Sequence, residues 1–319
     1  MTPTAARPTA GPRRRGPGGG PRRRGSSAPE PGSGPSEAHA RFLRLDLARA
    51  EREWQRYEGT PQRDLFRELR ERFLARHARA VGWALDAASG PGRFSRLLGT
   101  AASRRVAFDL SPSMLRVGRE RAPAGAPENP AEPVRGDALR PPFAPSAFGE
   151  IALLGNALGF EGADGPALLD AVEALLAPEA RLLVEIAPGP GERSGYLARL
   201  PPGAVRRLLA APAAAVVPRV EREGFRREAE RHEEGEFRRW GVSELRARWD
   251  RAGWTVREVV AVAPALGPDA GRIAAVAAEP KAWSRLLELE ELLGRKAARW
   301  PDAAAVLMAV ERPRVDTIR

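Results

Sequence analysis

Three aspartates follow apolar segments at intervals that suit one shared site. Asp86 closes an apolar run, Asp109 follows 23 residues later in VAFDLSPSML, and Asp137 comes next in VRGDAL. A carboxylate at the end of a strand can accept hydrogen bonds from both hydroxyls of a ribose, and another can meet the exocyclic amine of an adenine. One such acid is more often a helix cap. Three of them at consecutive strand ends favour a common ligand site.

A turn of small residues directly follows the first aspartate. Residues 84–98 read ALDAASGPGRFSRLL, which predicts a strand, a tight loop holding Gly90 and Gly92, and a helix near 94–99. Glycines let a ligand approach the backbone closely, although such a turn can also need glycine only for its own geometry. Further on, IALLGNALGF (residues 151–160) places Asn156 after another expected strand, beside the same crevice.

These residues need a sheet to bring them together, and the chain predicts one. Apolar segments of strand length alternate with segments of helical periodicity, which is typical of a mostly parallel, doubly wound α/β sheet. The expected strands lie near residues 81–86, 105–109, 132–135, 150–154, 181–187, 254–262 and 304–311. The expected helices between them lie near residues 94–99, 112–121, 166–176 and 242–252.

The segment before the sheet, residues 37–80, also has helical periodicity. Leu65, Phe66, Leu69 and Phe73 form an apolar stripe after a break, and Thr60-Pro61 is a plausible helix start. We expect this helical segment to pack on the sheet or to cover its ligand crevice.

Composition separates the two ends of the chain. Residues 1–36 hold seven arginines and one glutamate among Pro, Gly and Ser, so we expect a disordered tail that carries about half of the net charge of +11. Residues 81–315 form the expected main domain, with insertions at about 189–239 and 263–301.

The residue inventory excludes several chemistries. The chain has no cysteine and only three histidines, which are far apart, so we expect no thiol nucleophile and no metal site. It has no apolar stretch of about 20 residues and no secretory signal, so we expect a soluble cytoplasmic protein without a membrane partner.

At this point the chain resembles the class I S-adenosylmethionine-dependent methyltransferases. The resemblance rests on LDAASGPGRF, FDLSPSML, GDA and LLGNALGF, in that order and spacing, and covers residues 81–187. The segments at 254–262 and 304–311 are similar to the closing β-hairpin of that family. The resemblance implies a Rossmann-like sheet of seven strands, mostly parallel with an antiparallel last strand, and S-adenosylmethionine as cofactor.

The resemblance also implies roles for single residues. The methionine portion of the cofactor would lie against Asp86 and the loop residues Ala88, Ser89, Gly90 and Gly92, with Ala88 standing where the family usually has its first glycine. The adenosine portion would be held by Asp109 at the ribose, Leu110 and Met114 beside the adenine, Asp137 at its N6 and Ala138 stacked nearby. Asn156 would line the methyl-donor end.

Two other ligands or acceptors compete with this reading. A nicotinamide dinucleotide site requires G-x-G-x-x-G, but Ser95 replaces the third glycine. Asp137 would also have no assigned role in such a site. RNA as methyl acceptor is favoured by the basic tail and by residues 219–231, whereas no N-P-P-Y-like segment follows the fourth strand.

We therefore expect methyl transfer to an O, N or C nucleophile of a small molecule. An RNA methyltransferase and a non-catalytic binding module remain the alternatives. Glu185, Tyr196 and His232 are candidate general bases, and no catalytic residue is assigned.

Overall fold

The computed structural model describes residues 47–121, 130–160, 164–187, 197, 200–223, 240–266, 273–296 and 305–314. The chain divides into two units, residues 1–36 and 37–319, and every described element belongs to the second. The tail expected to be disordered lies outside the described residues.

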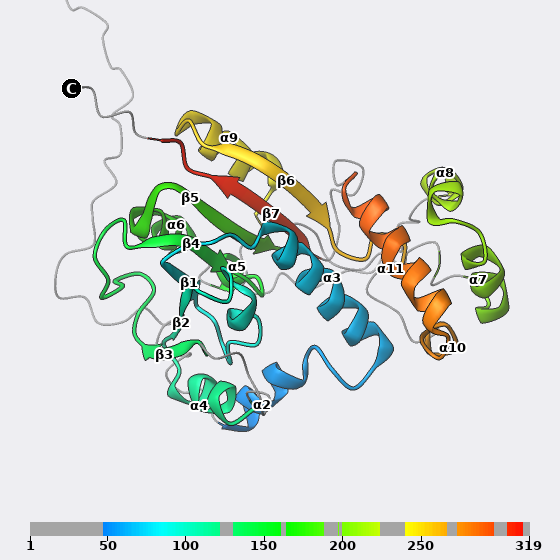
Figure 1. Ribbon diagram of the computed structural model, residues 1–319, viewed down its shortest axis with the longest axis horizontal. Helices are drawn as coiled ribbons and strands as arrows, with labels where there is room; N and C mark the ends of the chain where they lie inside the picture. Colours follow the sequence, from blue (N-terminus) through cyan, green and yellow to red (C-terminus); the bar gives the residue numbers. More distant parts are fainter. Residues whose placement is uncertain are drawn as a thin grey trace, which may run out of the picture. The chain divides into compact units, whose positions relative to one another are not determined.

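A seven-stranded sheet forms the centre of the second unit (Figure 1), in the order β3-β2-β1-β4-β5-β7-β6. Neighbouring strands from β3 to β5 are parallel, and β7 is antiparallel to both of its neighbours. The strands are β1 (Trp83–Ala87), β2 (Arg104–Asp109), β3 (Glu132–Arg135), β4 (Phe148–Leu153), β5 (Leu176–Ile186), β6 (Thr255–Ala261) and β7 (Val306–Glu311). The predicted fold class and all seven predicted strands are confirmed.

The strand order places a topological switch point between β1 and β4. The chain moves outward from β1 to β2 and β3, returns to the other side of β1, and continues through β4 and β5. Asp86 of β1 stands in register with Ala107 of β2 and with Ala152 of β4. In open α/β sheets, ligands bind at the carboxyl ends of the strands on either side of such a point.

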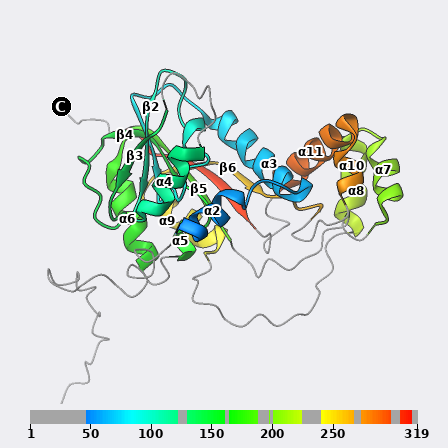
Figure 2. The same ribbon diagram turned by 90° about the horizontal axis from the view of Figure 1, so that it is seen from below.

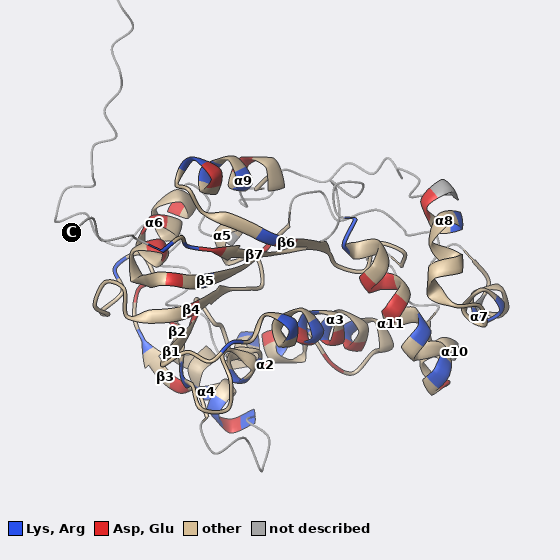
Figure 3. Cartoon of the chain, turned by 45° about the horizontal axis from the view of Figure 1, so that its top comes forward, with Lys and Arg blue, Asp and Glu red and all other residues tan. Residues whose placement is uncertain are grey.

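Helices cover both faces of the sheet (Figure 3): α3 and α4 lie on one face, α6 and α9 on the other. Figure 2 shows α2 beside α4, on which it packs. The helices that pack on the sheet or on α4 are α2 (Leu47–Gln55), α3 (Pro61–His77), α4 (Pro112–Arg121), α5 (Ala157–Phe160), α6 (Gly165–Leu175) and α9 (Val242–Arg251).

The two predicted insertions contribute a second group of helices. α7 (Pro202–Leu209), α8 (Ala213–Glu223), α10 (Ala274–Ala277) and α11 (Pro280–Gly294) pack on one another, and α11 also packs on α3 and β6. Figure 1 shows them together beyond the end of β6, on the side of the sheet where the parallel strands end.

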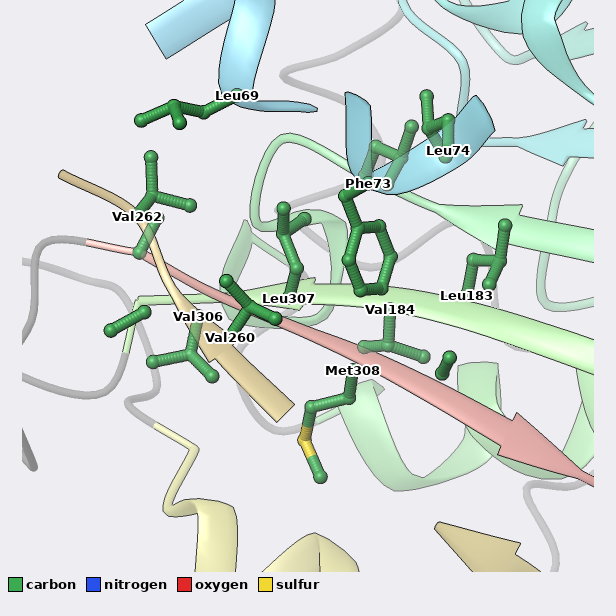
Figure 4. Close-up of a cluster of buried hydrophobic side chains, with 14 of the residues drawn as sticks. Leu69, Phe73, Leu74, Leu183, Val184, Val260, Val262, Val306, Leu307 and Met308 are labelled. Atoms are coloured by element: carbon green, nitrogen blue, oxygen red, sulfur yellow. The ribbon is translucent and has the colours of Figure 1, made fainter. Parts of the chain in front are cut away.

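α3 joins the N-terminal segment to the sheet. Thr60 caps it as predicted, because its hydroxyl accepts a hydrogen bond from the Arg63 N–H at 3.3 Å, and Pro61 occupies the first turn. Its buried face, including Phe73 and Leu74, lies over the strand residues Val184 and Leu307 (Figure 4). Each such side chain contributes about 1.5–3 kcal/mol through burial.

The helix expected at 94–99 is wrong in kind: only a 3-10 turn, Ser95–Leu97, forms there. Leu98 is extended, and the Gly99 N–H donates to the Glu150 carboxylate at 2.8 Å instead of continuing a helix.

Within the described ranges, no helix is both long enough and apolar enough to cross a membrane.

Candidate active site

The glycine-rich loop is fastened to the end of β2. The Asp109 carboxylate accepts hydrogen bonds from the Gly90 N–H at 2.7 Å and from the Ser111 N–H at 2.8 Å. The Ser89 N–H donates to the Phe108 carbonyl at 3.0 Å. The second predicted acid and the predicted loop therefore form one unit.

The loop itself turns through left-handed backbone. Ala88, Gly90 and Gly92 have φ values of +51°, +55° and +66°. A Cβ placed on Gly90 would meet no atom within 4 Å, so open space borders the backbone at that point. The loop thus has the geometry of a cradle that a ligand can approach closely.

Asp86 is buried and Asp109 is half-buried, and neither forms an ion pair with any residue that the structure describes. Asp86 is 2% exposed and accepts a hydrogen bond from the Ser95 hydroxyl at 2.6 Å. Burial raises the pKa of Asp86 to about 7, with the hydrogen bond from Ser95 opposing the shift and the nearby Asp109 charge adding to it. Burial likewise raises the pKa of Asp109 to about 6, against its backbone hydrogen bonds.

The third acid follows the end of β3 and is linked to the second. The Gly136 N–H donates to the Asp109 carbonyl at 3.1 Å, and the next residue, Asp137, accepts a hydrogen bond from the Leu139 N–H at 2.8 Å. Ala138 is half-buried against the core. The structure therefore brings the ends of β1, β2 and β3 together as the sequence predicts.

The two apolar residues expected beside an adenine lie in different surroundings. Leu110, directly after β2, is half-buried. Met114 is 5% exposed and packs with Val117 and with Ala50 of α2 in a small apolar cluster. No sequence pattern indicates that α2 covers this side of α4.

Asn156 holds the ends of β4 and β5 together. It adopts a left-handed backbone conformation with φ +62°, and its side-chain oxygen accepts a hydrogen bond from the Ala187 N–H at 3.2 Å. The preceding residue, Gly155, donates its N–H to the Glu185 carboxylate at 3.2 Å. Asn156 therefore lies across the switch point from the glycine-rich loop.

Glu185 is occupied by a buried ion pair. Both of its oxygens accept hydrogen bonds from the Arg70 guanidinium, at 3.0 Å from Nε and 2.5 Å from Nη2. Burial alone would raise the pKa of Glu185, but the charge and hydrogen bonds of Arg70 hold it below its ordinary value. Glu185 is thus not a free general base. The other two candidates, Tyr196 and His232, lie outside the described residues.

Three residues near this site were missed by the sequence analysis. Arg70 interrupts the apolar stripe of α3, and a cation in such a stripe is a signal for a buried acidic partner. Tyr57, between α2 and α3, packs its ring on Phe94. Gly118 lets α4 approach the loop, since a Cβ there would lie 2.2 Å from the Pro91 carbonyl oxygen.

The arrangement suits a ligand that carries hydroxyl and amine donors. Three carboxylates, an open backbone cradle and an amide face the carboxyl ends of strands around a switch point. Among the residues that the structure describes, no cluster of three or more His, Asp or Glu has the geometry to hold a metal ion.

Comparison with known protein families finds a match in the part of the chain that holds this site. The family model of a methyltransferase domain matches residues 84–179. That range holds the glycine-rich loop, all three aspartates and Asn156. No curated protein is significantly similar to the chain in sequence.

A solved structure shares the fold at low sequence identity, and a second is similar in part. Magnesium protoporphyrin IX methyltransferase from Synechocystis PCC 6803, solved with bound S-adenosylhomocysteine, has a TM-score of 0.50 and 11% identity over 86% of this chain and 100% of that one. A putative methyltransferase in complex with the Haloferax volcanii activator Trm112 has a TM-score of 0.48 and 17% identity, over 84% and 96% of the two chains.

The chain therefore contains a methyltransferase domain. The match covers less than half of the chain, and the similarity to the Synechocystis structure shows that the fold is shared over most of the rest.

Proposed function

We propose that the protein transfers a methyl group from S-adenosylmethionine to an O, N or C nucleophile of a small molecule. The choice of cofactor rests on one observation. The Asp109 carboxylate accepts a hydrogen bond from the Gly90 N–H at 2.7 Å, so Asp109 and the glycine-rich loop form a single unit. It combines a carboxylate for a ribose with exposed backbone for the rest of the ligand.

The residues present fit this cofactor. Asp86 and the loop residues 88–92 would hold the methionine portion, Asp109 the ribose, and Asp137 the adenine N6, with Leu110, Met114 and Ala138 around the ring. Asn156 would line the methyl-donor end. When bound, S-adenosylmethionine supplies an electrophilic methyl group on a sulfonium. The protein's contribution is then to hold the acceptor in line with it and to keep water out.

The segment between α2 and α3, which we call the cover, lies over the glycine-rich loop and favours a small acceptor. Arg93, directly after the loop, donates to the Trp54 carbonyl at 2.9 Å and pairs with Glu58 at 3.0 Å, so the segment between α2 and α3 is fastened over the loop. Arginines along α3 alternate with acids (Figure 3) and are paired, as in Arg67–Glu71 and Arg72–Glu291. Paired arginines offer little free charge to a phosphate backbone.

A labelling experiment tests the acceptor class. The protein is incubated with methyl-labelled S-adenosylmethionine and either a small-molecule extract or total RNA, and Asp109→Ala serves as the background control. Label transferred to the small-molecule fraction by the wild-type protein alone is expected. Label in RNA instead would replace the small-molecule acceptor with RNA, and label in neither would favour the non-catalytic module.

A further inference from the structure

Tyr57 has its ring fixed by contacts from two parts of the fold. Its ring meets that of Phe94, after the glycine-rich loop, edge to face at a centroid distance of 5.1 Å. The guanidinium carbon of Arg70 lies 5.2 Å from the Tyr57 ring centroid, and Arg70 is itself held by Glu185 of β5. The half-buried ring therefore has little freedom to leave its position.

The hydroxyl of Tyr57 reaches the other side of the switch point. A Cβ placed on Gly155, at the end of β4, would lie 3.9 Å from this oxygen. Phe94 follows β1 and Gly155 precedes Asn156, so the phenol spans the gap between the loop and the methyl-donor end. The side chain thus overlies the point where the sheet topology places a ligand.

The same hydroxyl has a hydrogen-bonding capacity that the fold leaves unused. Within the described part of the chain, no residue makes a hydrogen bond to it, whereas the neighbouring Arg70 uses Nε, Nη1 and Nη2 on Glu185 and Phe66. Burial raises the pKa of the Tyr57 phenol, with Arg70 opposing the shift. The group is therefore a neutral donor at physiological pH.

We infer that the Tyr57 hydroxyl donates a hydrogen bond to the carboxylate of the methionine portion of the bound cofactor. This inference rests on the proposed function. The acids Asp86, Asp109 and Asp137 suit hydroxyl and amine donors of the ligand, but a ligand carboxylate needs a donor from the protein. Arg70 is already neutralised by Glu185, and Tyr57 is a donor beside the loop that would hold the methionine portion. A hydroxyl bound to a carboxylate is among the stronger hydrogen bonds.

Two ligands that differ in the methionine portion test this contact. S-adenosylhomocysteine carries the carboxylate, and 5′-methylthioadenosine lacks the whole amino-acid end. Calorimetry on wild-type protein and Tyr57→Phe should show S-adenosylhomocysteine binding weakened about tenfold or more by the substitution. Binding of 5′-methylthioadenosine should be unchanged, because phenylalanine keeps the ring contacts with Phe94 and Arg70.

A neighbouring aromatic residue gives the matched control. The Trp54 ring centroid lies 4.8 Å from the Arg93 guanidinium carbon. Trp54→Phe alters this contact between α2 and the glycine-rich loop without removing a hydroxyl from the site. It should leave the ratio of the two affinities as in the wild-type protein.

Three outcomes would contradict the proposals, and they are distinguishable. Unchanged S-adenosylhomocysteine binding in Tyr57→Phe overturns the inference alone. Equal weakening of both ligands also overturns it, and assigns Tyr57 to the packing of the cover or to the acceptor side. A wild-type protein that binds neither ligand overturns the proposed function itself.

Discussion

The carboxylates on the two sides of the switch point have different partners and opposite pKa shifts. At the ends of β1 and β2, Asp86 and Asp109 are held by a hydroxyl and by backbone N–H groups, and their pKa values are raised. At the end of β5, Glu185 lies in a bidentate pair with Arg70, and its pKa is lowered.

We propose that this difference separates acids that bind a ligand from an acid that stabilises the fold. A buried carboxylate without a cation costs free energy to ionise, and a ligand that brings donors and positive charge recovers that cost. A buried carboxylate that already has its cation gains nothing from a ligand. We therefore propose that the β1–β2 side binds the ligand, whereas Glu185 on the β5 side anchors α3 to the sheet.

Breaking the ion pair should give the largest effect. Glu185→Gln leaves the Arg70 charge buried without an anionic partner, so the free energy of unfolding should fall by about 3–5 kcal/mol in a denaturant titration. The control is Arg72→Met, which removes an arginine of the same helix from its half-exposed pair with Glu291 and should cost less than about 1 kcal/mol. Equal losses in the two variants would contradict the structural role of Glu185.

The ligand side should show the opposite pH dependence from the ion pair. The pKa of Asp86 is raised from 3.8 to about 7, so the folded protein keeps a proton that the unfolded chain releases. The free energy of unfolding should therefore fall as pH rises from 4 to 7, by up to about 4 kcal/mol from this group.

The comparison with Asp86→Asn isolates that contribution. The buried acids Glu150 and Glu290 also have raised pKa values and give the same trend, so only the difference between wild-type protein and Asp86→Asn is informative. The variant should lose less stability over this range. Parallel pH profiles would show that Asp86 is already ionised in the fold.

The close approach of α4 to the loop should matter more than the helix propensity of its sequence. Gly118→Ala places a Cβ against the Pro91 carbonyl oxygen, so we expect a loss of about 2 kcal/mol although alanine favours helices. Gly82→Ala is the control, because a Cβ there meets no atom within 4 Å. Thermal unfolding of the two variants decides the point, and a Gly118→Ala protein as stable as wild type would refute it.

The smallest expected effect concerns the loop backbone. Ala88 has φ +51°, which costs an alanine about 1–2 kcal/mol, whereas glycine loses more entropy on folding. Ala88→Gly should therefore stabilise the protein by about 0.5 kcal/mol, and Ala87→Gly in β1 should destabilise it. Chemical denaturation of both variants measures the difference. A destabilised Ala88→Gly protein would mean that the strain is already relieved.

The structural features that the sequence predicts correctly are those determined by local periodicity and residue spacing. The strands, the Thr60 cap and the placement of the three aspartates follow from apolar runs and from the register of a parallel sheet. The failed helix at 94–99 depended on a long-range partner, Glu150, that takes the Gly99 N–H.

The parts that could not be predicted depend on residues distant in sequence. The pair of Arg70 with Glu185 joins positions 115 apart, and the packing of Tyr57 on Phe94 depends on how the N-terminal segment crosses the loop. Side-chain partners of this kind leave no spacing signal in one chain. Only the polar residue within the apolar stripe of α3 hinted at them.

We expect the Asp109–loop unit to bind the adenosyl cofactor, and calorimetric titration with S-adenosylhomocysteine measures this binding. The wild-type protein should bind this ligand and not NADH. Asp109→Ala should weaken binding by about 100-fold, because it removes the carboxylate that would hold the ribose and that fastens Gly90. An unchanged affinity in Asp109→Ala, or binding of NADH in place of S-adenosylhomocysteine, would show that this unit does not bind the adenosyl cofactor.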